Sequence, residues 1–309
     1  MKNKSTLIMG GVFLLLVVIF LLTSLHPKEV TQGATPLFPG EKPVFDKFEI
    51  NNPKSGLIVL VKQGDSWKMT KPTEYKAGKQ AIDQLLESLT SIMVDGVVSS
   101  EVSEQKRLGV DDSTGIDLKA YSGGKQVLDV LIGDYTPDLS HTYARMKNSK
   151  DIALWRGVFS RIAIREPDDW RDKSIYSFNE GDITSIKAVD AKQTRDLTLS
   201  DSTWVYKENG KDKPVDQFKV RQLVTAIASL SCDSFAADED IPRAGTIKPD
   251  VRVSFKIRNG DTHTFDVWNP GKDTNKNTYL FRKENGDMLF RFYEYRGAFL
   301  PVSYDKLKL

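Results

Sequence analysis

A series of matches at one constant offset is the sequence feature that most limits how this chain can fold. Trp67 and Trp204 differ in residue number by the same amount as Arg145 and Arg282. Trp155 meets an aromatic residue, Phe292, at that same offset. Single matches of this kind arise by chance, but several at one offset predict an internal duplication.

Each half of the repeat has the same order of local patterns. Residues 79–94 and 216–230 place apolar side chains at helical spacing, which is typical of an amphipathic helix with one buried face. Alternating apolar and polar residues on both sides of each helix predict antiparallel strands, joined by turns such as Asn259-Gly260. We therefore expect an α+β fold. Each copy should hold a strand pair, one amphipathic helix and an antiparallel meander of about four strands.

The N-terminus carries an apolar segment that predicts a membrane anchor. Residues 7–25 contain no charged residue, and a helix of nineteen residues would span about 28 Å, close to the hydrocarbon thickness of a bilayer. Lys2 and Lys4 precede it, so the positive-inside rule places residues 1–6 in the cytoplasm as a short tail. We expect an uncleaved single transmembrane helix, because the residues after the segment make a poor cleavage site for a signal peptide.

The remaining boundaries follow from composition and from the repeat. Residues 26–43 contain four prolines and two glycines, which indicate an extended linker. The first α+β repeat is expected over residues 44–178 and the second over residues 179–309. The chain has 44 basic and 42 acidic residues, and without Lys2 and Lys4 the two numbers are equal. A neutral body provides no general attraction to phosphate, so nucleic acid is not an expected partner.

The sequence contains no recognisable catalytic or metal-binding motif. Its three histidines and single cysteine do not occur at zinc-ligand spacing, and the GxSxG and Walker A patterns are missing. We expect no catalytic residue, no cofactor and no metal, and therefore a protein that is not an enzyme.

Two groups of residues are candidates for a role in binding or assembly. Exposed aromatic clusters often mark partner surfaces, and the aromatic residues near the C-terminus predict one that includes Phe292, Tyr293, Tyr295 and Phe299. The alternative for these residues is a core edge that closes the second copy. The second group lies where one copy passes into the next and predicts a junction that fixes their angle: Asp168, Asp169, Trp170 and Arg171.

Several of these segments together resemble a known family. They are the DSWKM sequence followed by KP, the LLESL helix, Leu108-Gly109-Val110, the IGDYTP segment, the YAR segment at residues 143–145 and the closure EPDDWRDKSIYSF at residues 166–178. This combination resembles domain-of-unknown-function family 4340 over most of residues 44–309. The second copy is less faithful, because it has WNPGKD where the first has LIGDYTP. The resemblance implies single-pass envelope proteins without established enzymatic activity, accessory to ABC transport systems of the gliding-motility type.

The resulting functional expectation is a non-enzymatic, membrane-anchored envelope protein. It would be an accessory or scaffold subunit of a membrane complex such as a gliding-motility-type ABC transporter, with an integral-membrane permease or related subunit as partner. Its N-terminus would be cytoplasmic and its body periplasmic or otherwise extracytoplasmic. The alternative is a periplasmic module that binds a glycan or lipid in a cleft between the two repeats.

Overall fold

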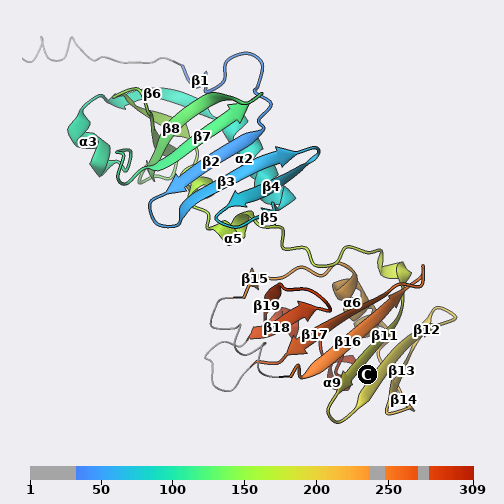
Figure 1. The fold of residues 1–309 in the computed structure, drawn as a ribbon. Helices are drawn as coiled ribbons and strands as arrows, with labels where there is room; N and C mark the ends of the chain where they lie inside the picture. Colours follow the sequence, from blue (N-terminus) through green and yellow to red (C-terminus); the bar gives the residue numbers. More distant parts are fainter. Residues whose placement is uncertain (1–32, 237–247, 271–277) are drawn as a thin grey trace, which may run out of the picture. The chain divides into compact units, whose positions relative to one another are not determined.

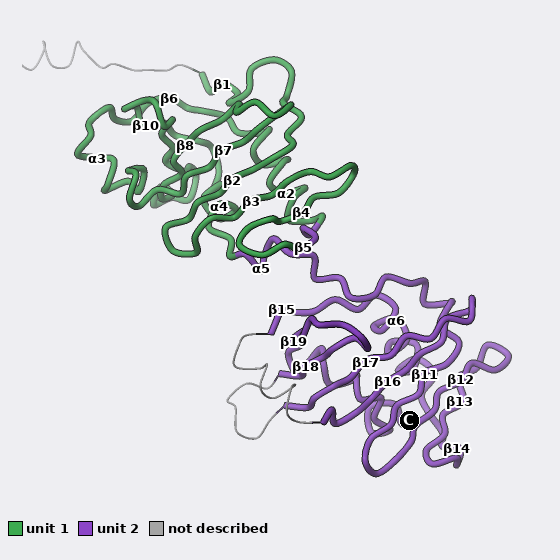
Figure 2. Tube along the Cα trace, viewed as in Figure 1, with its two compact units in different colours: residues 1–74, 79–166 green, residues 75–78, 167–309 purple. Residues whose placement is uncertain are grey.

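The computed structural model describes residues 33–236, 248–270 and 278–309. The chain divides into two compact units, which are coloured separately in Figure 2. Unit 1 consists of residues 1–74 and 79–166, and unit 2 consists of residues 75–78 and 167–309. Each unit is built around one antiparallel sheet.

The sheet associated with unit 1 has ten strands in the order β1-β6-β10-β9-β8-β7-β2-β3-β4-β5. Their bounds are β1 (Thr35–Pro36), β2 (Lys47–Asn52), β3 (Gly56–Gln63), β4 (Ser66–Lys71), β5 (Tyr75–Lys76), β6 (Met93–Ser99), β7 (Ile116–Ser122), β8 (Lys125–Tyr135), β9 (His141–Met146) and β10 (Ile152–Arg156). The helices of this region are α2 (Lys79–Thr90), α3 (Val102–Arg107) and α4 (Ser160–Ala163).

Alternation along the strands of unit 1 separates a buried face from an exposed one. In β2, Phe48 and Ile50 are fully buried, whereas Glu49 between them is partly exposed. Helix α2 lies behind β2, β3 and β4 in Figure 1, and its buried residues are Ile82, Leu85 and Leu89. The helical spacing of these three residues gives α2 its one apolar face.

The sheet of unit 2 has nine strands in the order β14-β13-β12-β11-β16-β17-β18-β19-β15. Their bounds are β11 (Ile183–Asp190), β12 (Thr194–Ser200), β13 (Thr203–Glu208), β14 (Lys211–Lys213), β15 (Ser234–Phe235), β16 (Val251–Ile257), β17 (Thr262–Trp268), β18 (Thr278–Lys283) and β19 (Leu289–Tyr293). The helices are α5 (Pro167–Trp170), the 3-10 turn η1 (Glu180–Asp182), α6 (Gln217–Ala228), α8 (Glu294–Gly297) and α9 (Tyr304–Leu307).

The core of unit 2 forms between its sheet and α6. Val220, Leu223 and Ile227 of α6 join a cluster that includes Phe255 of β16 and Phe281 of β18. Asp216 caps the helix, because its side chain accepts hydrogen bonds from the backbone N–H groups of Phe218 at 2.8 Å and Lys219 at 3.4 Å. The apolar face and the cap together explain where α6 begins and which side it buries.

The two sheets have corresponding strand orders. Read from β6 to β5 and from β15 to β14, each strand of one sheet has a counterpart in the other, and β1 is an addition at the edge of the first. The counterparts β9 and β18 begin at residues 141 and 278, and β10 and β19 begin at residues 152 and 289. Both pairs therefore have the offset that separates Trp67 from Trp204 in the sequence.

The predicted fold class is wrong. The described residues form mostly two antiparallel sheets, with 44% strand and 19% helix, instead of two α+β repeats in which a strand pair, a helix and a meander are separate. The strand pair and the meander are not separate layers, because β2 pairs with β7 and β11 pairs with β16 to form continuous sheets. Within the described residues no helix is both long and apolar enough to span a bilayer. The predicted anchor at residues 7–25 and the tail at residues 1–6 lie outside them, as do residues 26–32 of the predicted linker.

The cap of α6 gives a direct test of how local sequence contributes to unit 2. We expect Asp216→Ala to lower the free energy of unfolding of unit 2 by about 1 kcal/mol, because two backbone N–H groups lose their acceptor. Asp216→Asn keeps an acceptor oxygen, so it should lower the free energy of unfolding by only a few tenths of the amount expected for Asp216→Ala. Denaturant unfolding followed by tryptophan fluorescence measures both variants. Equal stabilities of the Ala and Asn variants would contradict the assignment of the cap.

Candidate functional site

Two exposed tyrosines at the end of the last strand form the most prominent aromatic surface in the described part of unit 2. Tyr293 ends β19 and is 51% exposed, and Tyr295 lies in α8 and is 77% exposed. Their rings stack with centroids 6.2 Å apart and planes 14° from parallel. With Glu294, Ala298 and Lys306 they line a shallow groove of about 660 Å³, called the tyrosine groove below.

The backbone beneath the tyrosine groove is held by polar contacts to one buried carboxylate. The Asp233 carboxylate accepts a hydrogen bond from the Tyr293 backbone N–H at 2.8 Å and forms an ion pair with Arg296 Nη1 at 2.5 Å. Arg296 Nη2 also donates to the backbone carbonyl of Ser231 at 2.7 Å. The Asp233 side chain is only 7% exposed, so the site rests on a fixed framework while its rings remain open to solvent.

Of the four residues predicted for an aromatic interaction surface, two belong to the core of unit 2 and two are exposed. Phe292 is fully buried in β19, and Phe299 is partly buried against the core of unit 2. Tyr293 and Tyr295 are exposed and lie together. Phe292 and Tyr293 face opposite sides because successive residues of a strand alternate.

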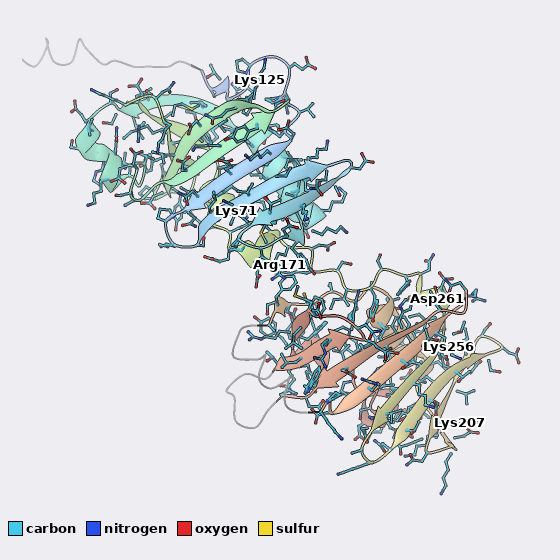
Figure 3. The ribbon with its side chains drawn as sticks, viewed as in Figure 1. Lys71, Lys125, Arg171, Lys207, Lys256 and Asp261 are labelled. Carbon is cyan, nitrogen blue, oxygen red and sulfur yellow. The ribbon has the colours of Figure 1, made fainter. Side chains whose placement is uncertain are left out.

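The predicted junction residues lie in and directly after α5. Trp170 is fully buried, and Asp168 forms an ion pair with Arg171, from its carboxylate to Nη1 at 2.9 Å. The Arg171 guanidinium also stacks on two rings, with its central carbon 4.3 Å from the centroid of Tyr75 and 3.3 Å from that of Phe235. Figure 3 labels Arg171 beside α5. Its role in setting an angle between the two predicted repeats stays a prediction.

Backbone pairing adds to the contacts around Arg171. Residues 75–78, which belong to unit 2, bridge to residues 170–172 through the pair Ala77 and Arg171. The Gly78 N–H donates to the Trp170 carbonyl at 2.8 Å, and the Asp172 N–H donates to the Lys76 carbonyl at the same distance. A Cβ at Gly78 would lie 3.1 Å from the Arg171 carbonyl oxygen, so the close approach favours glycine.

A polar network in unit 1 was not predicted from the sequence. The Asp95 carboxylate of β6 lies 2.7 Å from His141 Nε2 and 2.7 Å from Arg156 Nε. His141 Nδ1 lies 2.7 Å from the Ser140 hydroxyl, which also donates to Asp138 Oδ2 at 2.7 Å. The neighbouring Ser140-His141 pair was visible in the sequence, but Asp95 is distant from both along the chain and no local pattern connects it to them.

In this network a serine contacts a histidine that contacts an aspartate, as in a Ser-His-Asp triad. The serine hydroxyl, however, has a second acceptor. Asp138 competes with His141 for the proton of the Ser140 hydroxyl, which would weaken activation of that oxygen as a nucleophile. The same carboxylate accepts the Ser140 backbone N–H at 3.1 Å and the Thr136 hydroxyl at 2.6 Å. These bonds close the turn between β8 and β9, so we interpret the network as a structural one.

Stability should depend on Arg171 more than on an exposed arginine of unit 2. We expect Arg171→Ala to lower the free energy of unfolding by roughly 2 kcal/mol, because two ring contacts and an ion pair are lost at a largely buried site. Arg171→Lys should recover less than half, since an ammonium lacks the planar stacking group. Arg221→Ala, at an exposed position of α6, is the matched control. Equal effects of Arg171→Ala and Arg221→Ala in thermal unfolding would contradict this account.

The network around Asp95 predicts a titration outside the ordinary range. Hydrogen bonding to Arg156, and then to His141, lowers the pKa of the Asp95 carboxyl to about 2. A lowered native pKa stabilises the fold above the unfolded pKa of about 3.9, and this contribution is lost as the pH falls toward 2. We expect Arg156→Gln to raise the pKa of Asp95 toward its unfolded value, as measured by carbon-detected NMR titration of the side-chain carboxyl. Arg161→Gln, at an exposed position of α4, should leave the pKa unchanged, and equal shifts in both variants would refute the assignment.

Comparison with known proteins identifies the family of this chain. Residues 1–309 match no solved structure. A curated relative, the "Pentafunctional AROM polypeptide" of Schizosaccharomyces japonicus (strain yFS275 / FY16936), is 33% identical over 79 residues, which are 26% of this chain and 5% of that polypeptide. The chain thus spans a small fraction of that relative's length. The family profile "Domain of unknown function (DUF4340)" matches residues 67–249, more than half of the chain. The protein belongs to this family of unknown function.

Proposed function

We propose that this protein is a non-enzymatic interaction subunit that is held at a membrane by its apolar N-terminal segment and contacts a partner through the tyrosine groove. The observation that carries the proposal is the stacked pair Tyr293 and Tyr295, which stays exposed above a partly buried polar framework. Tyrosine is enriched among residues that dominate binding energy at protein interfaces. It supplies a large contact area at a low cost in side-chain entropy.

The way the groove is built supports a binding role. Aromatic side chains on a mobile backbone would lose conformational entropy on binding. Asp233 and Arg296 already fix the backbone that carries Tyr293, so this cost is smaller here. Glu294 and Lys306 at the edge of the groove offer charges of both signs. Such polar rims give specificity to an apolar centre.

The apolar segment at residues 7–25 supports attachment to the inner (cytoplasmic) membrane. Lys2 and Lys4 favour an orientation with the N-terminus in the cytoplasm and the body on the opposite side. Attachment raises the local concentration of the groove near other membrane proteins, so a modest contact area is sufficient for binding. We propose an integral-membrane partner, with the permease or a related subunit of a gliding-motility-type ABC transporter as the specific candidate.

The test is affinity purification of the intact chain from its own cells in mild detergent, with crosslinking and mass spectrometry. We expect co-purification of a membrane complex, and a loss of at least about tenfold in recovered partner for the double variant Tyr293→Ser, Tyr295→Ser, because hot-spot tyrosines contribute about 2 kcal/mol or more. Phe218→Ser is the matched control, since Phe218 is an aromatic residue of α6 that is 63% exposed.

Two outcomes would contradict the proposal. Recovery of the chain alone, across several detergents and with crosslinking, would rule out a stable or transient subunit role and favour a ligand-binding module. Equal recovery of the partner by the tyrosine variant and by Phe218→Ser would show that binding uses another surface.

A further inference from the structure

A second groove lies in unit 1, where the chain before β2 runs close to the ends of β8 and β9. It has a volume of about 470 Å³ and is called the Asp129 groove below. Lys125, labelled in Figure 3, marks the start of β8 at this end of the sheet. The groove is lined by Leu37, Phe38, Gln126, Val127, Leu128, Asp129, Met146, Lys147 and Asn148.

The lining combines apolar walls with one carboxylate. Leu37, Phe38, Val127 and Met146 are apolar, and Val127 is 41% exposed. Asp129 is the acidic residue of the lining, and its Oδ2 accepts a hydrogen bond from the exposed Gln126 Nε2 at 3.0 Å. Its other oxygen, Oδ1, is buried and accepts no hydrogen bond from the described residues. A buried acceptor without a donor is unfavourable, so a donor that reaches it is favoured.

The corresponding carboxylate of unit 2 shows what this position can hold. Asp266 of β17 follows Asp129 of β8 at the repeat offset, and β17 and β8 are counterparts in the two sheets. Both oxygens of Asp266 are paired with Arg252, at 2.8 Å from Nε and 3.2 Å from Nη2. Arg282 adds a second guanidinium at 3.9 Å from Asp266 and stacks on Trp268 at 5.1 Å.

Lys119 of β7 lies opposite Asp129 in the strand register but forms no ion pair with it among the described residues, and two further basic residues of this region are engaged elsewhere. Arg145, which matches Arg282 in the sequence, donates to the backbone carbonyls of Val110 and Ser149, both at 2.8 Å. Lys147 Nζ lies 2.8 Å from Asp112 and 3.4 Å from Asp117. Among the residues that the structure describes, the carboxylate of unit 1 therefore lacks the guanidinium partners that its counterpart has.

We propose that the Asp129 groove binds the arginine side chain of a partner peptide. A guanidinium can donate two parallel hydrogen bonds to a carboxylate, as Arg252 does to Asp266. It would displace the exposed Gln126 amide from Oδ2, and rotation of the Asp129 carboxylate would bring Oδ1 within reach of the same guanidinium. The apolar walls would cover the methylene groups of the arginine, as apolar surfaces commonly do for long basic side chains.

A peptide fits this groove better than free arginine does. Lys147, the basic residue of the lining, is already paired with two aspartates, so no uncommitted cation in the described lining would receive the α-carboxylate of a free amino acid. A capped peptide carries no such charge. This site lies in unit 1 and does not depend on the tyrosine groove of unit 2.

The test uses the full chain in detergent and isothermal titration calorimetry with capped peptides. The probe is acetyl-Gly-Arg-Gly-amide, compared with the citrulline and lysine peptides of the same form and with free L-arginine. We expect saturable binding of the arginine peptide, weaker binding of the lysine peptide and of free arginine, and no binding of the citrulline peptide, which has the shape but not the charge. Asp129→Asn should lower the affinity for the arginine peptide at least about tenfold, as expected for loss of a charge-assisted pair.

Two control variants distinguish loss of the site from a general change of charge and from a failure to fold. Asp65→Asn changes an exposed aspartate of the turn between β3 and β4 and should leave the affinity unchanged. Gln126→Arg would supply a guanidinium within the chain and should abolish binding, which keeps the test valid if Asp129→Asn does not fold. Absence of saturable arginine binding, equal binding of the citrulline peptide, or unchanged affinity in Gln126→Arg would overturn the proposal. Tighter binding of free arginine than of the peptide would overturn the assignment to a peptide.

Discussion

The pairing of strands that are distant in the sequence is the constraint on which the rest of this structure depends. β2 pairs with β7 and places Ile50 opposite Leu118, although α2, α3 and four strands come between them along the chain. β11 pairs with β16 in the same way and places Ile186 opposite Phe255. Each pairing joins a run of four strands, β2-β3-β4-β5 or β11-β12-β13-β14, to a meander and creates one continuous apolar face large enough for a helix to cover.

The sequence allowed the local elements to be predicted, but not their assembly into sheets. The period of apolar residues located α2 and α6, and Asn259-Gly260 lies in the turn between β16 and β17. The α+β prediction failed because strand alternation does not reveal which strands pair across a sheet, and the pairing of β2 with β7 turns two layers into one. Helices α2 and α6 end after about three turns, so strand residues outnumber helical residues.

In the candidate sites, too, local features could be predicted from the sequence, whereas contacts between distant segments could not. Alternation along β19 would have placed Phe292 and Tyr293 on opposite faces, so the burial of Phe292 was predictable in principle. The contacts of Arg171 with Tyr75 and Phe235, and the ion pair of Asp95 with Arg156, join segments that lie far apart along the chain. Only the folded chain brings such side chains together.

The two units use equivalent positions in different ways. Arg156 ends β10 and Tyr293 ends its counterpart β19, and each strand end is held by an aspartate that lies in or directly before the neighbouring strand, β6 or β15. In unit 1 this aspartate, Asp95, pairs with the arginine side chain. In unit 2, Asp233 bonds to the tyrosine backbone instead and leaves the ring exposed. One framework thus supports a closed polar network in one unit and an open aromatic surface in the other.

The most direct test of a partner at this aromatic surface is site-specific photocrosslinking in the cells that make the protein. A benzophenone amino acid would replace Tyr295 in the intact chain and, in a matched chain, the exposed Phe218 of α6. We expect a discrete adduct with a membrane protein from position 295 and none from position 218. No adduct from position 295, or the same adducts from both positions, would contradict this expectation.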